Sequence, residues 1–332
     1  MRSIFLGAKI IQKVYSRETV DFLAANAQLN PVPTSKEHIL ANPDIYADTE
    51  YIFATWGMPE FTKEEIAKYL PSLKAVFYGA GTVQYFARDF LNSGVRIFSA
   101  WGANAVPVAE YTVAQITLAN KGFFLAGKRY NSLENGKKAA SYFSKMPGNF
   151  DVNVGIIGAG MIGKMVIKML QSYRVNVLVY DPFLSEEQAE ALGAKKVPLE
   201  ELFASCQTIS NHVANLPATV GMLHYGLFRL MKENAVFINT GRGAQVVEAD
   251  LIRILKENPN MTAVLDVTQP EPPLEDSEFY TLENVILTPH IAGSSGKEVA
   301  RMGEYMADQF RKHISNEPCE YEVTIEMLDT MA

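Results

Sequence analysis

Val154-Gly-Ile-Ile-Gly158-Ala-Gly160-Met-Ile-Gly163 runs from an apolar, strand-like segment through closely spaced glycines into a helical segment. Gly158 permits a tight turn, Gly160 lets main-chain N–H groups approach a pyrophosphate at the helix start, and Gly163 lets the helix pack closely on the strand. Glycine pairs occur in many turns, so this motif by itself is a weak signal. Its meaning depends on what the next strand carries.

The next strand ends in a carboxylate at the required spacing. The apolar segment 176–180 predicts that strand, and Asp181 follows it, eighteen residues after Gly163. A ribose-binding acid is expected about 20 residues after the glycines. Asp181 would accept hydrogen bonds from both ribose hydroxyls and repel a 2′-phosphate, so we predict a dinucleotide-binding unit that prefers NAD(H). The alternative is that Asp181-Pro182 is only a strand-ending turn.

The same alternation of strands and helices extends along the chain. Strands are expected at 4–6, 51–54, 75–78, 95–98, 152–157, 176–180, 208–210, 235–238, 262–267 and 285–287. Helices are expected between them, including 16–27, 62–70, 84–91, 103–121, 161–173 and 248–257. Strands and helices in this order predict βαβ units. The fold class is therefore α/β, with two Rossmann-like or flavodoxin-like parallel-sheet domains.

The restart of the alternation at 151 also predicts where the domains lie. We expect one domain over 101–294 and a discontinuous one over 1–100 plus 295–332, because the last helix, 297–313, has no strand of its own and is expected to fold back on the first domain. The segment 121–149 has weak periodicity and is predicted to be a connection or arm. A chain of 332 residues is long enough for two such domains.

Composition excludes several classes of function. The formal net charge is −7 and no basic run is present, so we expect no nucleic-acid partner. Two cysteines, Cys206 and Cys319, cannot form a disulfide framework or a four-ligand zinc site, and we expect reduced thiols and no metal. Lys9 interrupts the apolar N-terminus, and no apolar run approaches the ~18 residues of a membrane span. We therefore expect a cytoplasmic protein without a membrane partner.

Three polar residues stand just beyond predicted strands of the second domain. Arg242 follows the strand at 235–238, Glu271 lies in a proline-rich loop five residues after Asp266, and His290 follows Thr288-Pro289. Parallel α/β sheets bind ligands at this edge. An arginine can anchor and polarise a 2-keto acid, a histidine can deliver a proton, and a glutamate can keep that histidine charged. Taken separately, they could equally be a surface arginine, a solvated glutamate and a helix-capping histidine.

The sequence resembles the D-isomer-specific 2-hydroxyacid dehydrogenases, which include phosphoglycerate, glycerate and D-lactate dehydrogenases. The matching segments are 103–110, 158–163, 180–182, 212–219, 231–243, 265–267, 271–272 and 288–293. The resemblance implies that Arg242 binds the substrate carboxylate and carbonyl, that His290 is the acid/base, and that Glu271 is its partner. It also implies an active site in the cleft between a substrate-binding (lid) domain and an NAD-binding domain, and a homodimer built on the latter.

The resemblance further implies a set of ligand contacts. The cofactor set is Gly158, Gly160, Met161, Ile162, Gly163, Asp181, His212, Val213, Thr219, Thr240, Gly241, Asp266 and Gly293. Asp266 would orient the nicotinamide carboxamide. In the first domain, main-chain N–H groups of the turn at Gly79 and Ala80 would hold the substrate carboxylate. Trp56, with Trp101 as a further candidate, would meet the substrate tail, although ordinary loop packing explains these tryptophans equally well.

Departures from the family pattern leave the three polar residues intact. Met161 stands where many relatives have arginine, Thr268 where an aromatic residue is usual, and Ala214 where proline is usual. The leading hypothesis is an NAD-dependent enzyme that interconverts a small-molecule 2-keto acid and a D-2-hydroxy acid. An NAD-sensing, corepressor-like binding protein is the alternative. Formate dehydrogenase, of the same fold, is disfavoured because it has Gln where this chain has Glu271. The sequence does not indicate which acid is the substrate.

Overall fold

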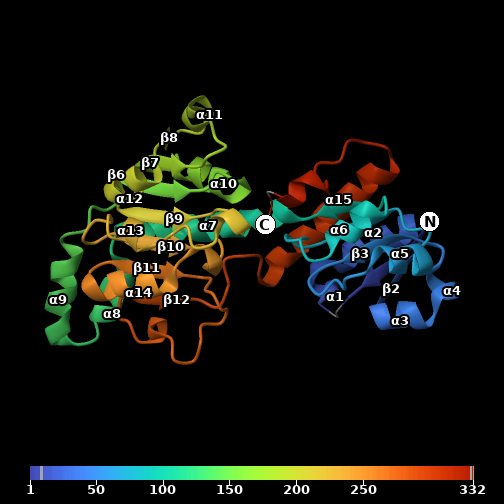
Figure 1. Cartoon of the computed structure of the whole chain (residues 1–332), viewed down its shortest axis with the longest axis horizontal. Coiled ribbons are helices and arrows are strands. Elements are labelled where there is room, and N and C mark those ends of the chain that lie inside the picture. The colour runs from blue at the N-terminus through green and yellow to red at the C-terminus, as the bar shows by residue number, and fades with distance from the viewer. Residues whose placement is uncertain (8–9, 330, 332) are drawn as a thin grey trace. The chain divides into compact units, whose positions relative to one another are not determined.

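The structure of the protein is a computed structural model that describes residues 1–7, 10–329 and 331. The described residues form two compact units (Figure 1). Unit 1 comprises Met1–Asn104 and Ser294–Ala332, and unit 2 comprises Ala105–Gly293. Each unit is built on one predominantly or wholly parallel sheet, so the predicted α/β class is confirmed.

Unit 2 contains the sheet that carries the glycine motif. Its strands are β6 (Phe150–Ile157), β7 (Arg174–Tyr180), β8 (Lys195–Lys196), β9 (Thr208–Asn211), β10 (Val236–Asn239), β11 (Thr262–Leu265) and β12 (Val285–Leu287). They lie in the order β12-β11-β10-β9-β6-β7-β8, with parallel pairings throughout the described strands. The strand order reverses direction at β6, and parallel sheets bind ligands at the carboxyl end of such a point.

Helices cover both faces of this sheet because alternate strand residues point to opposite sides. Val236 and Ile238 of β10 pack in a core with the long helix α7 and with α10, whereas Phe237 packs in a second core with α12, α13 and α14. The helices are α7 (Trp101–Asn120), α10 (Met161–Leu170), α11 (Glu186–Ala191), α12 (Leu199–Ser205), α13 (Tyr225–Phe228) and α14 (Glu248–Glu257), with short 3₁₀ turns η1 (Pro217–Thr219), η2 (Gly243–Gln245) and η3 (Glu278–Tyr280).

Unit 1 repeats this arrangement on a smaller sheet. Its strands are β1 (Arg2–Leu6), β2 (Leu29–Thr34), β3 (Thr49–Ala54), β4 (Ala75–Tyr78), β5 (Arg96–Ser99) and β13 (Glu322–Val323), in the order β13-β5-β4-β3-β1-β2. The helices are α1 (Ile11–Val14), α2 (Arg17–Ala27), α3 (Lys36–Ala41), α4 (Pro43–Tyr46), α5 (Lys63–Tyr69), α6 (Ala87–Asn92) and α15 (Val299–Ile314), with η4 (Gly296–Glu298) and η5 (Glu326–Asp329). The strands pair in parallel except β13, which is antiparallel to β5.

The last helix, α15, packs on the sheet of unit 1. Met302, Met306 and Phe310 of α15 are buried in a core with the phenylalanines of the central strands. Phe77 stacks on Phe98 with ring centroids 4.8 Å apart, and Phe310 meets Phe77 edge-on at 5.5 Å. Aromatic pairs in these geometries add to the stabilisation from buried area alone.

Two strands of unit 1 were not predicted. β2 contains Pro31 and Pro33, which argue against a strand when only sequence is considered, but β2 lies at the sheet edge, where proline is tolerated. β13 has only two residues, too few to give a periodic signal, and it exists because Val323 and Glu322 pair with β5. It corrects the expectation that no strand accompanies the last helix.

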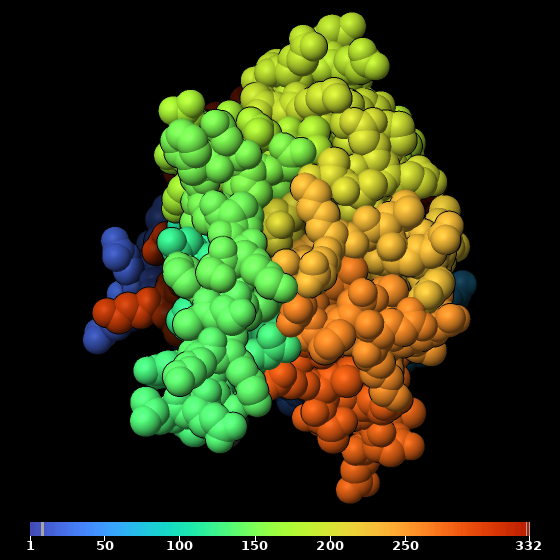
Figure 2. Space-filling view, turned by 90° about the vertical axis from the view of Figure 1, so that its left-hand side faces the viewer, coloured from blue at the N-terminus to red at the C-terminus, as the bar shows by residue number. Residues whose placement is uncertain are grey.

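The segment 121–149 is also more ordered than predicted, because it forms helices α8 (Phe123–Arg129) and α9 (Leu133–Phe143). Gly122, at φ +67°, separates α8 from α7, and the Ser132 hydroxyl caps α9 by accepting from Asn135 N. Figure 2 shows this helical arm in green along one side of unit 2. Its periodicity is weak because apolar residues such as Leu133 face outward. Across the described residues, no helix is long and apolar enough to cross a bilayer.

Candidate functional site

The glycine motif forms a closed turn between β6 and α10. Gly158 has φ +90°, donates to Tyr180 O at 2.8 Å, and lies so close to Val213 N that a Cβ would approach it to 2.8 Å. A Cβ on Gly163 would lie 2.0 Å from Gly158 O, so only glycine allows the helix to approach the turn. Gly160, the N-cap of α10, faces open space: a Cβ there would meet no atom within 4 Å. This space at a helix N-terminus fits a pyrophosphate.

Asp181 lies against that turn. Its Oδ2 accepts from Ala159 N at 2.7 Å, and its Oδ1 accepts from Phe183 N at 2.8 Å. The carboxylate therefore holds the glycine turn to the end of β7 and also closes its own turn. Each carboxylate oxygen can accept a further hydrogen bond, so the arrangement remains compatible with ribose hydroxyls. Met161, the first residue of α10, is 44% exposed.

His212 and Thr240 meet beneath the carboxyl edge of the sheet. His212 is buried, its Nε2 lies 2.9 Å from Ser210 Oγ, and its Nδ1 lies 3.5 Å from Thr240 Oγ1. Burial lowers the pKa of His212 to about 3, so the ring is neutral near pH 7. It is thus a fixed, uncharged part of the wall and is not available as a proton donor.

Two other residues expected to contact a cofactor are engaged locally. Thr219 Oγ1 accepts from Leu216 N at 3.0 Å and lies 2.7 Å from Ala214 O, to which it donates, so the hydroxyl closes its own loop. Gly241 N donates to Asn239 Oδ1 at 3.1 Å. Both residues shape the loops at the carboxyl edge of the sheet.

Asp266, at the end of β11, organises the loop that carries His290. It is 2% exposed, its Oδ1 accepts from Thr288 Oγ1 at 2.6 Å and Ile291 N at 2.8 Å, and its Oδ2 accepts from Ala292 N at 2.9 Å. Its main-chain oxygen also accepts from His290 N at 3.1 Å. This positioning role was not predicted; the sequence suggested only a contact with the cofactor.

His290 and Glu271 form a hydrogen-bonded pair. His290 Nδ1 lies 2.6 Å from Glu271 Oε1, and both side chains are partly exposed. His290 adopts φ +54°, an uncommon left-handed conformation for a residue other than glycine. Because Asp266 holds the residues on either side, this conformation is stabilised by its surroundings.

Arg242 belongs to the same group. It follows β10, while Glu271 follows β11 and His290 follows β12, and these three strands are neighbours in the sheet. Burial lowers the pKa of Arg242, and the negative charge of Glu271 opposes that shift, so the guanidinium and the carboxylate are within electrostatic reach. Arg242 Nη1 also donates to Gly241 O at 2.7 Å. The structure therefore brings together all three polar residues singled out from the sequence.

Glu248 supports this group and was missed in the sequence. At the start of α14, its Oε1 accepts from Gln269 N at 2.7 Å and so holds the proline-rich loop that carries Glu271. Burial raises the pKa of Glu248. An acidic residue in the first turn of a helix is ordinarily attributed to the helix dipole, which conceals such a role.

The turn expected to hold a substrate carboxylate needs a correction. Gly79 N donates to Ala54 O at 2.8 Å and Ala80 N to Tyr78 O at 2.9 Å, and both residues are buried. These two amides are therefore used inside unit 1, and the partly exposed residues that follow them are Gly81 and Thr82.

The two tryptophans of unit 1 differ in their surroundings. Trp56 is 38% exposed, whereas Trp101 packs edge-on against Tyr321 with centroids 5.5 Å apart. Ordinary packing within unit 1 therefore accounts for Trp101 better than it accounts for Trp56. Among the residues that the structure describes, no group of three or more His, Cys, Asp or Glu could hold a metal ion.

Residues 126–292 match the family model described as D-isomer specific 2-hydroxyacid dehydrogenase, NAD binding domain. A D-3-phosphoglycerate dehydrogenase of Archaeoglobus fulgidus is 34% identical over 217 residues, covering 65% of this chain and 40% of that protein. A glyoxylate reductase of Korarchaeum cryptofilum is 30% identical over 248 residues, 74% of each. The chain thus matches less than half the length of the D-3-phosphoglycerate dehydrogenases to which it is similar.

Solved structures share the fold across nearly the whole chain. The apo form of Rhodotorula graminis D-mandelate dehydrogenase superposes with a TM-score of 0.83 at 20% identity and covers 97% of both chains. A phosphoglycerate oxidoreductase from Rhizobium etli gives 0.81 at 20% identity, covering 98% of this chain and 99% of that one. At these identities the likeness concerns the fold alone.

Proposed function

The chain belongs to the D-isomer-specific 2-hydroxyacid dehydrogenase family, and from this premise we propose that it uses NAD(H) to interconvert a 2-keto acid and the corresponding D-2-hydroxy acid. The observation that carries the proposal is the 2.6 Å contact of His290 with Glu271, beside Arg242. All three lie at the carboxyl edge of the sheet whose β6–α10 turn carries the glycine motif.

We assign the cofactor to unit 2. The open space at Gly160 and the N–H groups at the start of α10 would hold the pyrophosphate, and Asp181 would accept from the ribose hydroxyls. Bound NADH supplies the hydride that reduces the carbonyl carbon. The further contacts assigned by family resemblance are Met161, Ile162, His212, Val213, Thr219, Thr240, Gly241, Asp266 and Gly293.

Arg242 is assigned the substrate carboxylate and carbonyl. Its planar guanidinium can make two parallel hydrogen bonds, which fixes the acid in one orientation. The partly buried setting of Arg242 strengthens such contacts, because fewer water molecules compete for the same donors. Its positive charge also polarises the carbonyl towards reduction.

His290 is assigned the proton transfer. In reduction a protonated imidazole gives its proton to the forming alkoxide, and in oxidation the neutral ring takes it back. Glu271, bonded to Nδ1, stabilises the charged ring and leaves Nε2 to face the substrate oxygen. Asp266 and Glu248 hold the loops on which the two side chains stand.

Unit 1 is assigned to substrate recognition, with Trp56 as the apolar surface for the substrate tail and the Gly81–Thr82 turn in place of Gly79 and Ala80. We also place the protein in the cytoplasm, because both Cys206 and Cys319 are free thiols, which is typical of reducing compartments. The partner is a small molecule. Nothing in the charge pattern supports nucleic acid.

We assign a homodimer formed through unit 2. The helical arm exposes large apolar side chains, among them Phe123 at 56%, Tyr130 at 69% and Leu133 at 92%. Apolar side chains gathered on one exposed segment mark an interaction surface more often than chance exposure does. Figure 2 shows the arm in green on the face turned to the viewer.

The proposed activity is tested by an NADH-oxidation screen with a panel of 2-keto acids that carry small, branched, aromatic and phosphorylated side chains. We expect at least one acid to be reduced, with a D-configured product on chiral chromatography. Arg242→Lys should raise KM strongly while NADH binding is kept, because a lysine cannot make the paired hydrogen bonds. His290→Ala should lose about 10²–10⁴-fold in rate. If the wild type reduced none of the acids faster than the His290→Ala variant does, the proposal would be overturned.

A further inference from the structure

Three amide side chains are buried beneath the candidate site. Asn211 ends β9, Asn239 ends β10, and Gln245 closes η2; their exposed fractions are 0%, 1% and 0%. Burying an amide is unfavourable unless its donors and acceptors are satisfied. Apolar residues of similar size would fill the same space without that requirement, so the partners of these amides show what they contribute.

The three amides bond to one another. Asn211 Nδ2 donates to Asn239 Oδ1 at 3.0 Å and to Gln245 Oε1 at 2.6 Å. Each residue therefore restricts the rotamer of the others. A side-chain network of this kind is rigid when its members are satisfied and costly when one is lost.

The network holds the main chain of Arg242 from both sides. Gln245 Oε1 accepts from Arg242 N at 3.2 Å, and Asn239 Nδ2 donates to Arg242 O at 3.0 Å. Asn239 Oδ1 also accepts from Gly241 N at 3.1 Å. The direction in which the arginine leaves the sheet is thus set by side chains from two neighbouring strands and from η2.

The same network holds Val213 at both of its main-chain groups. Gln245 Nε2 donates to Val213 O at 2.7 Å, and Asn211 Oδ1 accepts from Val213 N at 3.4 Å. Val213 in turn lies against the glycine turn, because a Cβ on Gly158 would approach Val213 N to 2.8 Å. Val213 and the amides thus form a chain of contacts from the glycine turn to the peptide of Arg242.

We propose that Asn211, Asn239 and Gln245 are positioning residues that fix the cofactor loop at Val213 and the substrate-anchoring Arg242 relative to each other. The inference rests on the proposed function for the role of Arg242. Its consequence is that one amide influences both ligands: loosening the network lowers the affinity for NADH and for the 2-keto acid together. Proton transfer by His290 and Glu271, which are hydrogen-bonded to each other, keeps its pH dependence.

The test uses Gln245→Met, Asn211→Leu and the double variant in the full chain. NADH Kd is measured by fluorescence titration, which needs no turnover, and KM, kcat and the pH profile are measured with the 2-keto acid that the wild type reduces fastest. We expect NADH Kd and the KM of the acid each to rise on the order of tenfold, the usual effect of losing a buried hydrogen bond. The shape of the pH profile should not change.

The double variant tests whether the two amides act through one network. It removes their 2.6 Å contact together with their bonds to Val213 and to Arg242 N, so Kd and KM should rise by less than the product of the two single-variant effects. If one single variant fails to fold, Kd and KM of the other single variant decide the matter.

Asn284→Leu is the matched control. Asn284 is a buried amide whose Nδ2 donates to Leu255 O and Met261 O, at the amino ends of β11 and β12, the opposite edge of the sheet. This variant should lose stability without a change in Kd or KM. If the amide variants kept the wild-type values of NADH Kd and of KM for the 2-keto acid, the proposal would be overturned. If the wild type reduces no 2-keto acid, the proposed function fails, and NADH Kd alone still decides whether the network holds the cofactor loop.

Discussion

At the scale of single residues, one carboxylate at the end of β7 is expected to select the cofactor. Asp181 stands beside the glycine turn, with Ala159 N 2.7 Å from its Oδ2. A 2′-phosphate at this place would meet a negative charge. Kinetics with both cofactors should therefore show clearly higher kcat/KM with NADH than with NADPH. Equal efficiency would mean that Asp181 acts only as a turn residue.

The pair of His290 and Glu271 predicts a pH dependence. Reduction requires the protonated ring, so reductive kcat/KM should fall as pH rises, while the oxidative direction should gain. Glu271→Gln keeps the shape and removes the negative charge that faces the ring during proton transfer, so reductive kcat/KM should fall. Glu248→Gln, which acts one contact further away, should lower it less. Wild-type reductive kcat/KM in Glu271→Gln would show that the two side chains are not coupled.

His212 predicts a pH dependence of stability. Burial lowers its pKa to about 3 from the ordinary value of 6.5, so the unfolded chain takes up a proton at this residue below about pH 6.5 while the folded chain does not. The free energy of unfolding should therefore decrease on acidification, by about 2 kcal/mol between pH 6.5 and 5.

Urea denaturation across that range measures this effect. The decrease should be smaller in His212→Gln, which carries no titrating ring. His224→Asn, which replaces an exposed histidine and can still cap α13, should follow the wild type. If the free energy of unfolding of His212→Gln decreased as steeply on acidification as that of the wild type, a group other than His212 would cause the acid sensitivity.

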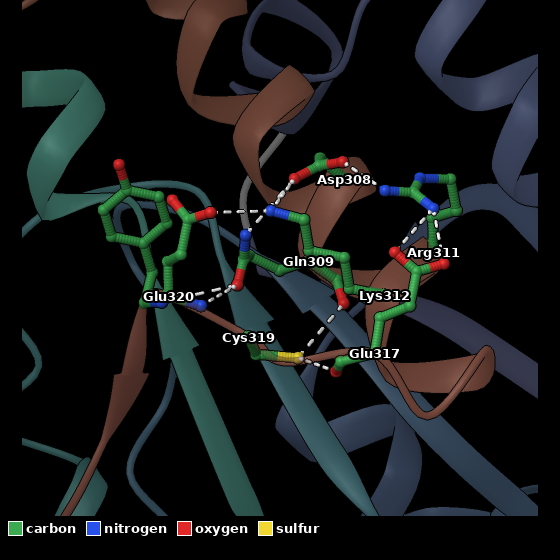
Figure 3. Close-up of polar contacts among 8 residues, drawn as sticks. Asp308, Gln309, Arg311, Lys312, Glu317, Cys319 and Glu320 are labelled. Atoms are coloured by element: carbon green, nitrogen blue, oxygen red, sulfur yellow. Dashed lines mark hydrogen bonds and ion pairs between the residues drawn. The ribbon is translucent and has the colours of Figure 1, made fainter.

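At the scale of elements, a polar cluster joins the C-terminal part of α15 to the segment that leads into β13 (Figure 3). Gln309, 1% exposed, accepts from Glu320 N at 2.9 Å and Tyr321 N at 3.3 Å through the same Oε1. Around it, Arg311 and Lys312 form ion pairs with Asp308, Glu317 and Glu320. The buried amide, rather than the exposed ion pairs, is expected to matter for stability.

Gln309→Leu should therefore reduce the free energy of unfolding by about 1–3 kcal/mol, because two main-chain N–H groups lose their acceptor. Arg311→Ala, which removes only exposed pairs, should have little effect. Urea denaturation of both variants makes the comparison. If Arg311→Ala were the more destabilising variant, the ion pairs and not the amide would anchor β13.

At the scale of the whole molecule, the exposed helical arm predicts assembly. Leu133 is 92% exposed at the start of α9, where an isolated chain gains nothing from a large apolar side chain. Leu133→Asp should shift the mass measured by light scattering from dimer to monomer at the same protein concentration. Leu274→Asp, at another exposed leucine, 63% exposed, serves as the control and should not change the mass. A wild-type protein that is monomeric would remove the proposed dimer.

Local chemistry was accessible from the sequence alone. The helices expected at 16–27 and 62–70, which the structure caps with Ser16 and Thr62, the strand at Ala75–Tyr78 and the glycine turn all appear, because each depends on residues within a few positions of one another. The order of Arg242, Glu271 and His290 after successive strands was sufficient to predict their meeting, since parallel strands place their carboxyl ends at one edge.

Tertiary structure decided what depends on distant partners. β13 exists through its pairing with β5, Asp266 and Glu248 acquire positioning roles through loops about 20 residues away, and Gln245 meets Asn211 from another strand. Neither a buried amide nor a short edge strand produces a periodic pattern in the sequence. Both are stabilised by the groups that the strand order brings next to them, and that order is a property of the folded chain as a whole.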